Sequence, residues 1–274
     1  MINDAAEGLG VLRFILVLFT APALCISALA APPIQALDPG PLGPDLGLSR
    51  APRVAEASAE NGTARLEPVD VALDPGHSSW DVGASAGGLR EFELTLDVAE
   101  RVQARLLAAG RSARLTRQDS SRIASFVPSE PTSAIQTEQE ARIAAAGPAR
   151  AYVSIHFNGH TDSRLRGTET YFNSDNRGAA SAVLAGSLQR STLAALAAAG
   201  YESIDRGVKE DLAAGKPYGH FFSLRGPFPS ALIETLFLSN AGDAAFLRQE
   251  GARDAVAEGI TRGIISFLDG EEPS

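Results

Sequence analysis

Residues 69–76, VDVALDPG, and residues 91–110, EFELTLDVAERVQARLLAAG, decide the fold class of this chain. The first stretch is a short apolar run that ends in turn residues, which is typical of a buried strand. The second repeats apolar residues every four positions from Leu94 to Leu106 and closes at Gly110, which predicts an amphipathic helix that ends before a glycine. A buried strand followed directly by such a helix indicates an α/β fold.

The same alternation continues to the end of the chain. Strands are predicted for SARLTR (112–117), AYVSIHFN (151–158), GTETYFN (167–173), FFSL (221–224) and SALIETLF (230–237), and helices for about 133–146, 177–199, 241–248 and 251–268. We therefore expect an α/β fold of one domain, with a mostly parallel twisted sheet flanked by helices on both faces. In such a sheet, the loops at the carboxyl ends of the strands are the natural place for a site.

The bulk composition limits the number of domains and the class of partner. With 274 residues, of which 45% are hydrophobic, the chain can bury one full core, whereas two large domains would each be small. The formal net charge of -9 argues against nucleic acid as a partner, because binding phosphates needs clustered Lys and Arg. Cys25 is the only cysteine and lies near the N-terminus, so a metal site elsewhere must use His, Asp or Glu.

The N-terminal region has the composition of an export signal followed by a tether. The apolar run 14–24 is too short for an ordinary membrane span, and Ala28-Leu29-Ala30 supplies small residues for cleavage. The stretch after it is rich in Pro, Gly and Ala and shows no periodicity. We predict a signal peptide or N-terminal membrane anchor (1–30), a disordered linker (31–66), one folded domain (67–270) and a tail (271–274). Export to the cell envelope is expected, with a membrane tether if the N-terminal segment stays uncleaved.

Four side chains in the folded part carry candidate chemistry. His77 follows the first strand, Glu91 opens the first helix, and His156 begins the polar tail of an apolar strand. Each also has an ordinary structural explanation as a turn residue, a helix-start carboxylate or a hydrogen-bonded core histidine. Glu234 interrupts ALIETLFL with a carboxylate that would cost several kcal/mol to bury ionised without a partner. Two imidazoles and one carboxylate can hold catalytic zinc, and a further glutamate can serve as the base.

Four blocks of the sequence follow one another along the folded part: VALDPGHSSWDVGA, GGLREFELTLDVAERVQARLLAAG, YVSIHFNG with RGTETYF, and PSALIETLFLSN. In this order they resemble the four sequence blocks of the zinc-dependent N-acetylmuramoyl-L-alanine amidases. The resemblance runs from about Val69 to Leu268, and it implies that residues 67–270 are a zinc amidase catalytic domain. It also implies an activity: hydrolysis of the amide between N-acetylmuramic acid and the L-alanine of the peptidoglycan stem peptide.

The resemblance assigns roles position by position. It implies that His77, Glu91 and His156 bind Zn²⁺ and that Glu234 is catalytic. Two positions depart from the family pattern: Ser78-Ser79 stands where a glycine pair is usual, and Leu236 stands where a glycine is usual.

Several other polar residues near these motifs are expected to be bystanders. Asn158 and Asn240 sit on motif positions, where we expect their amides to support loops. His160 and His220 match no ligand position; either could line the cleft, but we expect both to be solvated. Glu93 points away from Glu91 on a helix, so both cannot face one ion.

Two other functions fit the same sequence. One is a catalytically inactive wall-binding or regulatory module of this fold, and the other is a zinc carboxypeptidase that acts on stem peptides. The retention of all four reactive positions argues against the inactive module, and the carboxypeptidase stays as an alternative. We expect a monomer, with peptidoglycan as the substrate and no nucleic-acid partner, and a site that needs no activator to open it.

Overall fold

The computed structural model describes residues 65–126, 128–249 and 251–270. The predicted signal peptide and almost all of the predicted linker lie outside the described residues. In chain order the elements are β1 (Val69–Pro75), β2 (Ser85–Ala86), β3 (Leu89–Arg90), α1 (Glu91–Ala108), β4 (Ala113–Leu115), α2 (Pro131–Ala146), β5 (Ala149–Asn158), β6 (Thr168–Phe172), α3 (Gly178–Ala198), β7 (Asp205–Glu210), the 3-10 helices η1 (Asp211–Ala214) and η2 (Phe222–Leu224), β8 (Ser230–Phe237), α4 (Ala241–Leu247) and α5 (Ala252–Asp269).

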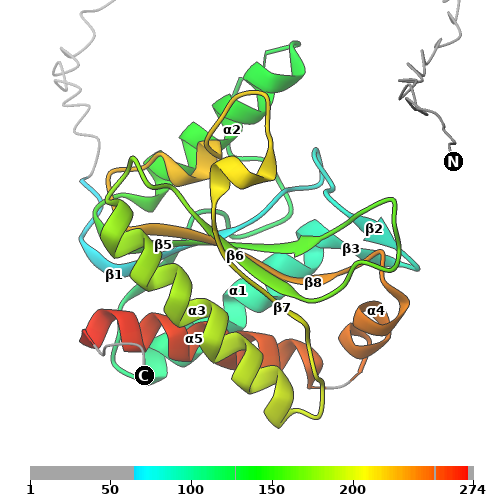
Figure 1. The fold of residues 1–274 in the computed structure, drawn as a ribbon. Helices are drawn as coiled ribbons and strands as arrows, with labels where there is room; N and C mark the ends of the chain where they lie inside the picture. Colours follow the sequence, from blue (N-terminus) through cyan, green and yellow to red (C-terminus); the bar gives the residue numbers. More distant parts are fainter. Residues whose placement is uncertain (1–64, 127, 250, 271–274) are drawn as a thin grey trace, which may run out of the picture. The chain divides into compact units, whose positions relative to one another are not determined.

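The described strands form a six-stranded sheet in the order β4-β1-β5-β8-β6-β7 and a small hairpin of β2 and β3. All neighbours in the large sheet are parallel except β8 and β6, which are antiparallel. Helices α1, α3 and α5 lie on one face of the sheet, and α2 lies beyond the other face (Figure 1). The structure therefore confirms the predicted α/β fold with a mostly parallel sheet and helices on both faces.

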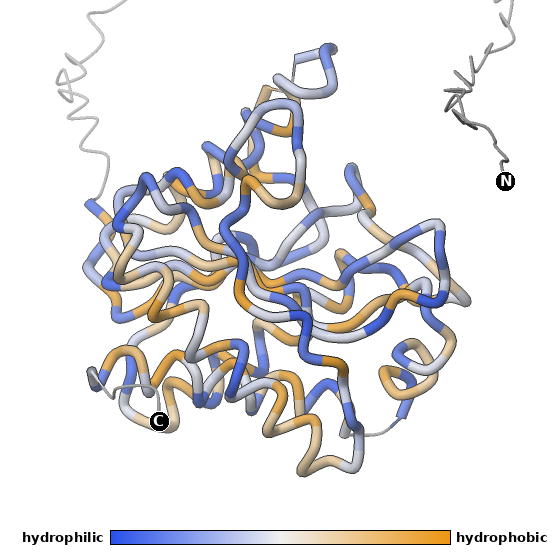
Figure 2. The backbone as a smooth tube through the Cα atoms, in the orientation of Figure 1, coloured by the Kyte–Doolittle hydropathy of each residue, from blue (hydrophilic) through white to orange (hydrophobic). Residues whose placement is uncertain are grey.

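The central strands are apolar along their length because both of their faces are covered. Val71, Val153, Ile155 and Ile233 are fully buried, and α1 adds Val98 and other residues to the same core. Figure 2 shows the hydrophobic positions gathered along these strands and along the helices below them. This rigid centre fixes where the strands end, and so where the polar side chains after them emerge.

Helices α3 and α5 approach each other closely because α5 carries glycine at the contact. A Cβ added to Gly263 would lie 2.8 Å from the Cα of Leu188, and one added to Gly259 would lie 2.5 Å from the Cα of Thr192. Such contacts involve backbone atoms, which cannot move aside as a flexible side chain can. The two helices therefore pack as one layer beneath the sheet (Figure 1).

The β2–β3 hairpin and η1 were not predicted, and two longer segments also differ from the sequence-based prediction. The predicted strand FFSL (221–224) is wrong: residues 222–224 form η2, where Leu224 N donates to Phe221 O at 3.0 Å. Phe222 is buried and Phe221 is partly buried, and the segment packs beside α2 rather than into a strand ladder. Strand β7 was not predicted, because DRGVKE is a charged, half-exposed edge strand without an apolar run. Among the described residues no helix combines the length and apolarity needed to cross a membrane.

Candidate metal centre

The topology places the two histidines of interest at one edge of the sheet. Strands β1 and β5 are parallel neighbours with Pro75 paired to Ile155, so both chains turn polar at the same level. His77 follows β1 directly, and His156 lies next to Glu234 across the β5–β8 pairing. The site is thus built at the carboxyl ends of three adjacent strands, as expected for a parallel sheet.

Glu91, at the start of α1, completes the group. Its Oε1 lies 2.9 Å from His156 Nδ1 and 3.3 Å from His77 Nε2. One ligand atom from each of these three residues lies within 4.8 Å of the other two. Two imidazole nitrogens and one carboxylate oxygen are the donor set that catalytic zinc takes, with a fourth position left for water or substrate. The donors present here therefore fit Zn²⁺.

Neighbouring groups orient two of the three candidate ligands. Asp81 Oδ2 lies 2.9 Å from His77 Nδ1, which leaves Nε2 of the same ring to face Glu91. The Glu91 carboxylate accepts hydrogen bonds from the backbone N–H of Ala84 at 2.7 Å and of Phe157 at 3.1 Å. Carboxylate–histidine pairs and hydrogen-bonded carboxylates of this kind hold ligands in place around metal ions.

The backbone at His77 is held in an unusual conformation. Its φ of 62° lies in the left-handed region, which costs energy for a residue with a Cβ. Two buried arginines hold it there: Arg142 donates to the carbonyl oxygens of Pro75 and His77, and Arg117 donates to those of Pro75 and Gly76. Position 76 requires glycine because of a close approach and not because of a turn: a Cβ there would lie 2.4 Å from the His156 ring.

The charges of the cluster depend on one another. Burial alone would lower the pKa of His77, but hydrogen bonds and charge from Asp81 and Glu91 raise it to about 10. Burial alone would raise the pKa of Glu91, but the hydrogen bonds from His156 and His77 hold it well below its usual range. Glu91 is therefore an ionised carboxylate that accepts hydrogen bonds from the two histidine rings. A metal cation bound between these three side chains would stabilise the same negative charge.

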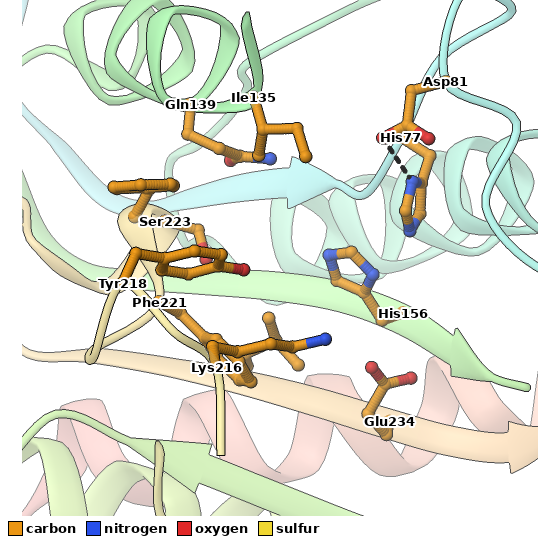
Figure 3. Close-up of a pocket in the computed structure, with 12 residues that line it drawn as sticks. His77, Asp81, Ile135, Gln139, His156, Lys216, Tyr218, Phe221, Ser223 and Glu234 are labelled. Carbon is orange, nitrogen blue, oxygen red and sulfur yellow. Dashed lines mark hydrogen bonds and ion pairs between the residues drawn. The ribbon is translucent and has the colours of Figure 1, made fainter. Parts of the chain in front are cut away.

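Glu234 stands beside this cluster without a partner. Its Oε2 is buried and makes no hydrogen bond. Burial raises the pKa of Glu234 well above its usual value, and the negative charge of Glu91 raises it further. Figure 3 shows Glu234, His156 and His77 around a common space. A carboxyl whose pKa is displaced upward in a cleft is the usual form of a general acid or base.

Three cavities meet at Glu234. One of about 290 Å³ also borders His77 and His156, one of about 540 Å³ borders Glu91, and one of about 390 Å³ extends over β6 and β7. Lys216 borders all three cavities as well. An extended ligand bound along this edge of the sheet would therefore have space on both sides of Glu234.

The remaining polar residues have structural explanations. Glu93 is exposed and pairs with Arg90, which agrees with the preference for Glu91. Asn240 caps α4 by accepting from the N–H groups of Gly242 and Asp243, as expected for a loop-supporting amide. His160 is exposed, as predicted.

Three positions needed the structure to explain them. His220 is not free in solvent, because Asp211 and Asp175 bind its two ring nitrogens. Ser78, in place of the family's glycine, is buried, and its N–H donates to the carbonyl of Asp81. Leu236 is fully buried in the core, so its side chain fills space that a glycine would leave empty.

Sequence reasoning missed another carboxylate at this edge of the sheet, Glu169, which is buried and lies directly opposite Glu234 across the β6–β8 pairing. Arg206 Nε lies 2.9 Å from Glu169 Oε2, and Lys209 pairs with the same oxygen. Asn158 Nδ2 donates to its other oxygen at 2.7 Å. The signal was available, because Glu169 interrupts the strand TETYF much as Glu234 interrupts its own strand.

Known proteins resemble this chain in sequence and in fold. Residues 71–266 match the family described as N-acetylmuramoyl-L-alanine amidase. The N-acetylmuramoyl-L-alanine amidase LytC of Bacillus subtilis is 32% identical over 196 residues, which are 71% of this chain but only 34% of that protein. The amidase AmiA of Salmonella typhimurium is 30% identical, covering 76% of this chain and 78% of AmiA. The solved structure of the amidase AmiC2 of Nostoc punctiforme superposes with a TM-score of 0.55 at 27% identity, covering 73% of this chain and 97% of that one.

Proposed function

The chain belongs to the N-acetylmuramoyl-L-alanine amidase family, and from that membership we propose that it is a zinc-dependent hydrolase of peptidoglycan. The bond cleaved is the amide between N-acetylmuramic acid and the L-alanine of the stem peptide. The observation that carries the zinc dependence is the convergence of His77, Glu91 and His156, with the unpartnered Glu234 beside them. Residues 67–270 form the catalytic domain, acting as a monomer in the cell envelope after export.

In this proposal His77, Glu91 and His156 hold the metal and Glu234 handles the proton. Zinc there would supply Lewis acidity toward a carbonyl and toward water, and its charge would offset the carboxylates that raise the pKa of Glu234. Glu234 takes a proton from the water that attacks the lactyl carbonyl. It then returns that proton to the nitrogen of L-alanine, so that the amide breaks into an acid and an amine.

The decisive experiment is digestion of purified sacculi by the zinc-loaded protein, read by mass spectrometry. Free stem peptides that begin with L-alanine support the amidase. Release of terminal D-alanine would make the protein a carboxypeptidase, and no product would make it a binding module. Zinc analysis of the parent and of the His77→Ala and His156→Ala variants tests the metal site directly, because each substitution removes one of three ligands.

The role of Glu234 has its own test. Glu234→Gln should retain zinc and lower the rate of sacculus digestion by about 10²–10⁴, the usual contribution of a general acid or base. Glu93→Gln is the matched control, because Glu93 is an exposed glutamate paired with Arg90. A Glu234→Gln variant as active as the Glu93→Gln control would remove Glu234 from the mechanism.

A further inference from the structure

The cavity of about 390 Å³ beside Glu234 carries positive charge in an otherwise acidic protein. Arg206, Lys209 and Lys216 line it, although the chain as a whole has a formal net charge of -9. Lys209 and Lys216 are also the only two lysines in the sequence, which otherwise relies on arginine. Both lysines therefore lie at one edge of the sheet, next to the candidate catalytic carboxyl.

Three cations border this cavity against two carboxyl groups, those of Glu169 and Glu234. Glu169 lines the cavity and pairs with both Arg206 and Lys209, so two cations share this one buried carboxylate. The side chain of Lys216 makes no hydrogen bond or ion pair with any residue that the structure describes. The cavity thus has an excess of positive charge and one ammonium group free to bind a ligand.

The loop that carries Lys216 is held in place at its base. Asp211 Oδ1 lies 2.6 Å from His220 Nδ1, and Asp211 Oδ2 accepts the backbone N–H of Phe221 at 2.8 Å. The Tyr218 ring stacks on Phe222, with the two ring centroids 4.4 Å apart. Figure 3 shows the ammonium of Lys216 directed toward the space between His156 and Glu234. The free cation is therefore presented to the site by an anchored loop.

The chemistry that fits a free ammonium in a positive cavity is a carboxylate. In peptidoglycan the second stem residue is an iso-linked glutamate, whose α-carboxyl is either free or amidated. When this α-carboxyl is not amidated, it is the carboxylate of the stem peptide that lies nearest to the amide between L-alanine and the glycan. Only L-alanine separates this carboxyl from the amide that is cleaved. Because Lys216 borders the same cavities as Glu234, a substrate with that amide beside Glu234 can place the carboxyl against Lys216.

We propose that Lys216 binds the free α-carboxylate of the second stem residue and so selects stem peptides in which this group is not amidated. Arg206 and Lys209, paired with Glu169, supply a positive background and do not need to leave their partner. This inference rests on the proposed amidase function for the identity of the ligand. Lys216 acts here as a specificity residue, and the reaction at the amide stays with Glu234.

Binding to the full-length Glu234→Gln protein, loaded with zinc, tests the proposal without turnover. The probes are two muramoyl tripeptides that differ only in whether the α-carboxyl of the second stem residue is free or amidated. The free acid should bind about fivefold more tightly, the size expected for a partly exposed charge pair. In Lys216→Met the preference should vanish through weaker binding of the acid alone, and Lys216→Arg should restore it.

Arg262→Met is the charge-matched control, because Arg262 is an exposed arginine on α5 that pairs with Glu258 and lines none of the three cavities. It should keep the full preference. The role of Lys216 would be overturned if the parent bound the two probes equally or bound neither of them. It would also be overturned if Lys216→Met lost the same affinity for both probes. Digestion of sacculi separates the two claims: preference for the acid without any digestion would refute the amidase and leave the carboxylate site standing.

Discussion

Glu234 sits where ionisation of a carboxyl is unfavourable, and this has a consequence for stability as well as for catalysis. Burial and the charge of Glu91 raise the pKa of Glu234 well above its usual value of 4.5. A carboxyl with a raised pKa binds its proton more tightly in the folded state. The contribution of this proton to the free energy of unfolding is therefore complete below the pKa that Glu234 has in the unfolded chain. It is lost as the pH rises from there toward the pKa that Glu234 has in the folded protein.

Glu234→Gln should thus stabilise the metal-free protein increasingly as the pH rises. At pH 5 the melting temperatures of variant and parent should be close, and by pH 8 the variant should melt higher by at least about 2 °C, as expected for a difference near 1 kcal/mol. Thermal unfolding in a chelator, at several pH values, measures the difference. A difference that stays constant with pH would show that Glu234 titrates normally.

Replacing Asp81 should lower the affinity of the site for zinc without changing any of the three candidate ligands. It accepts from His77 Nδ1 and so fixes which nitrogen faces Glu91. Asp81→Asn should lower zinc affinity about 10–100-fold, as is typical when the partner of a metal-binding histidine is lost. Competition with a chromogenic chelator gives the affinity. Asp162→Asn, another loop carboxylate, pairs only with its own loop and should leave the affinity unchanged.

At the scale of elements, the sequence predicted what periodicity and burial control. Strands such as β1, β5 and β8 have apolar runs because both faces are covered, and α1 shows a clear apolar stripe. Strand β7 and helix η2 could not be predicted, because their conformations depend on neighbours: β7 pairs with β6, and η2 is buried beside α2. Local pattern carries no information about a partner that is distant in the sequence.

The contact between α2 and the end of β1 is the element-scale interaction that supports the site. Arg142 on α2 is buried with Asp74 and Glu138 and also donates to the His77 carbonyl. Arg142→Met leaves both carboxylates without their cation and should lower the free energy of unfolding by about 3–5 kcal/mol in urea denaturation. Arg150→Met breaks an exposed pair with Asp70 and should cost less than about 1 kcal/mol. Similar losses in the two variants would contradict this account.

At the scale of the whole molecule, residues that are far apart in the sequence meet at one edge of the sheet and form the candidate site. His77, Glu91, His156 and Glu234 could be named from the sequence, because each stands at a strand end, a helix start or inside an apolar strand. The structure brings the first three together, and their roles remain proposals. Lys216 could not have been named, because nothing in GKPYG distinguishes a lysine that faces the site from one in solvent.

The described sheet, its core and the candidate site all come from residues 65–270, which predicts that the N-terminal 64 residues are dispensable for hydrolysis. A protein that comprises residues 65–274 should fold alone and cleave soluble muropeptides at a rate within about twofold of the full chain, since a domain with its own core folds independently. Rates on soluble muropeptides isolate the chemistry from any tethering to the wall, and circular dichroism checks the fold. A truncated protein that folds but has lost cleavage would show that the N-terminal residues contribute to the site, and the division of the chain at residue 66 would then be wrong.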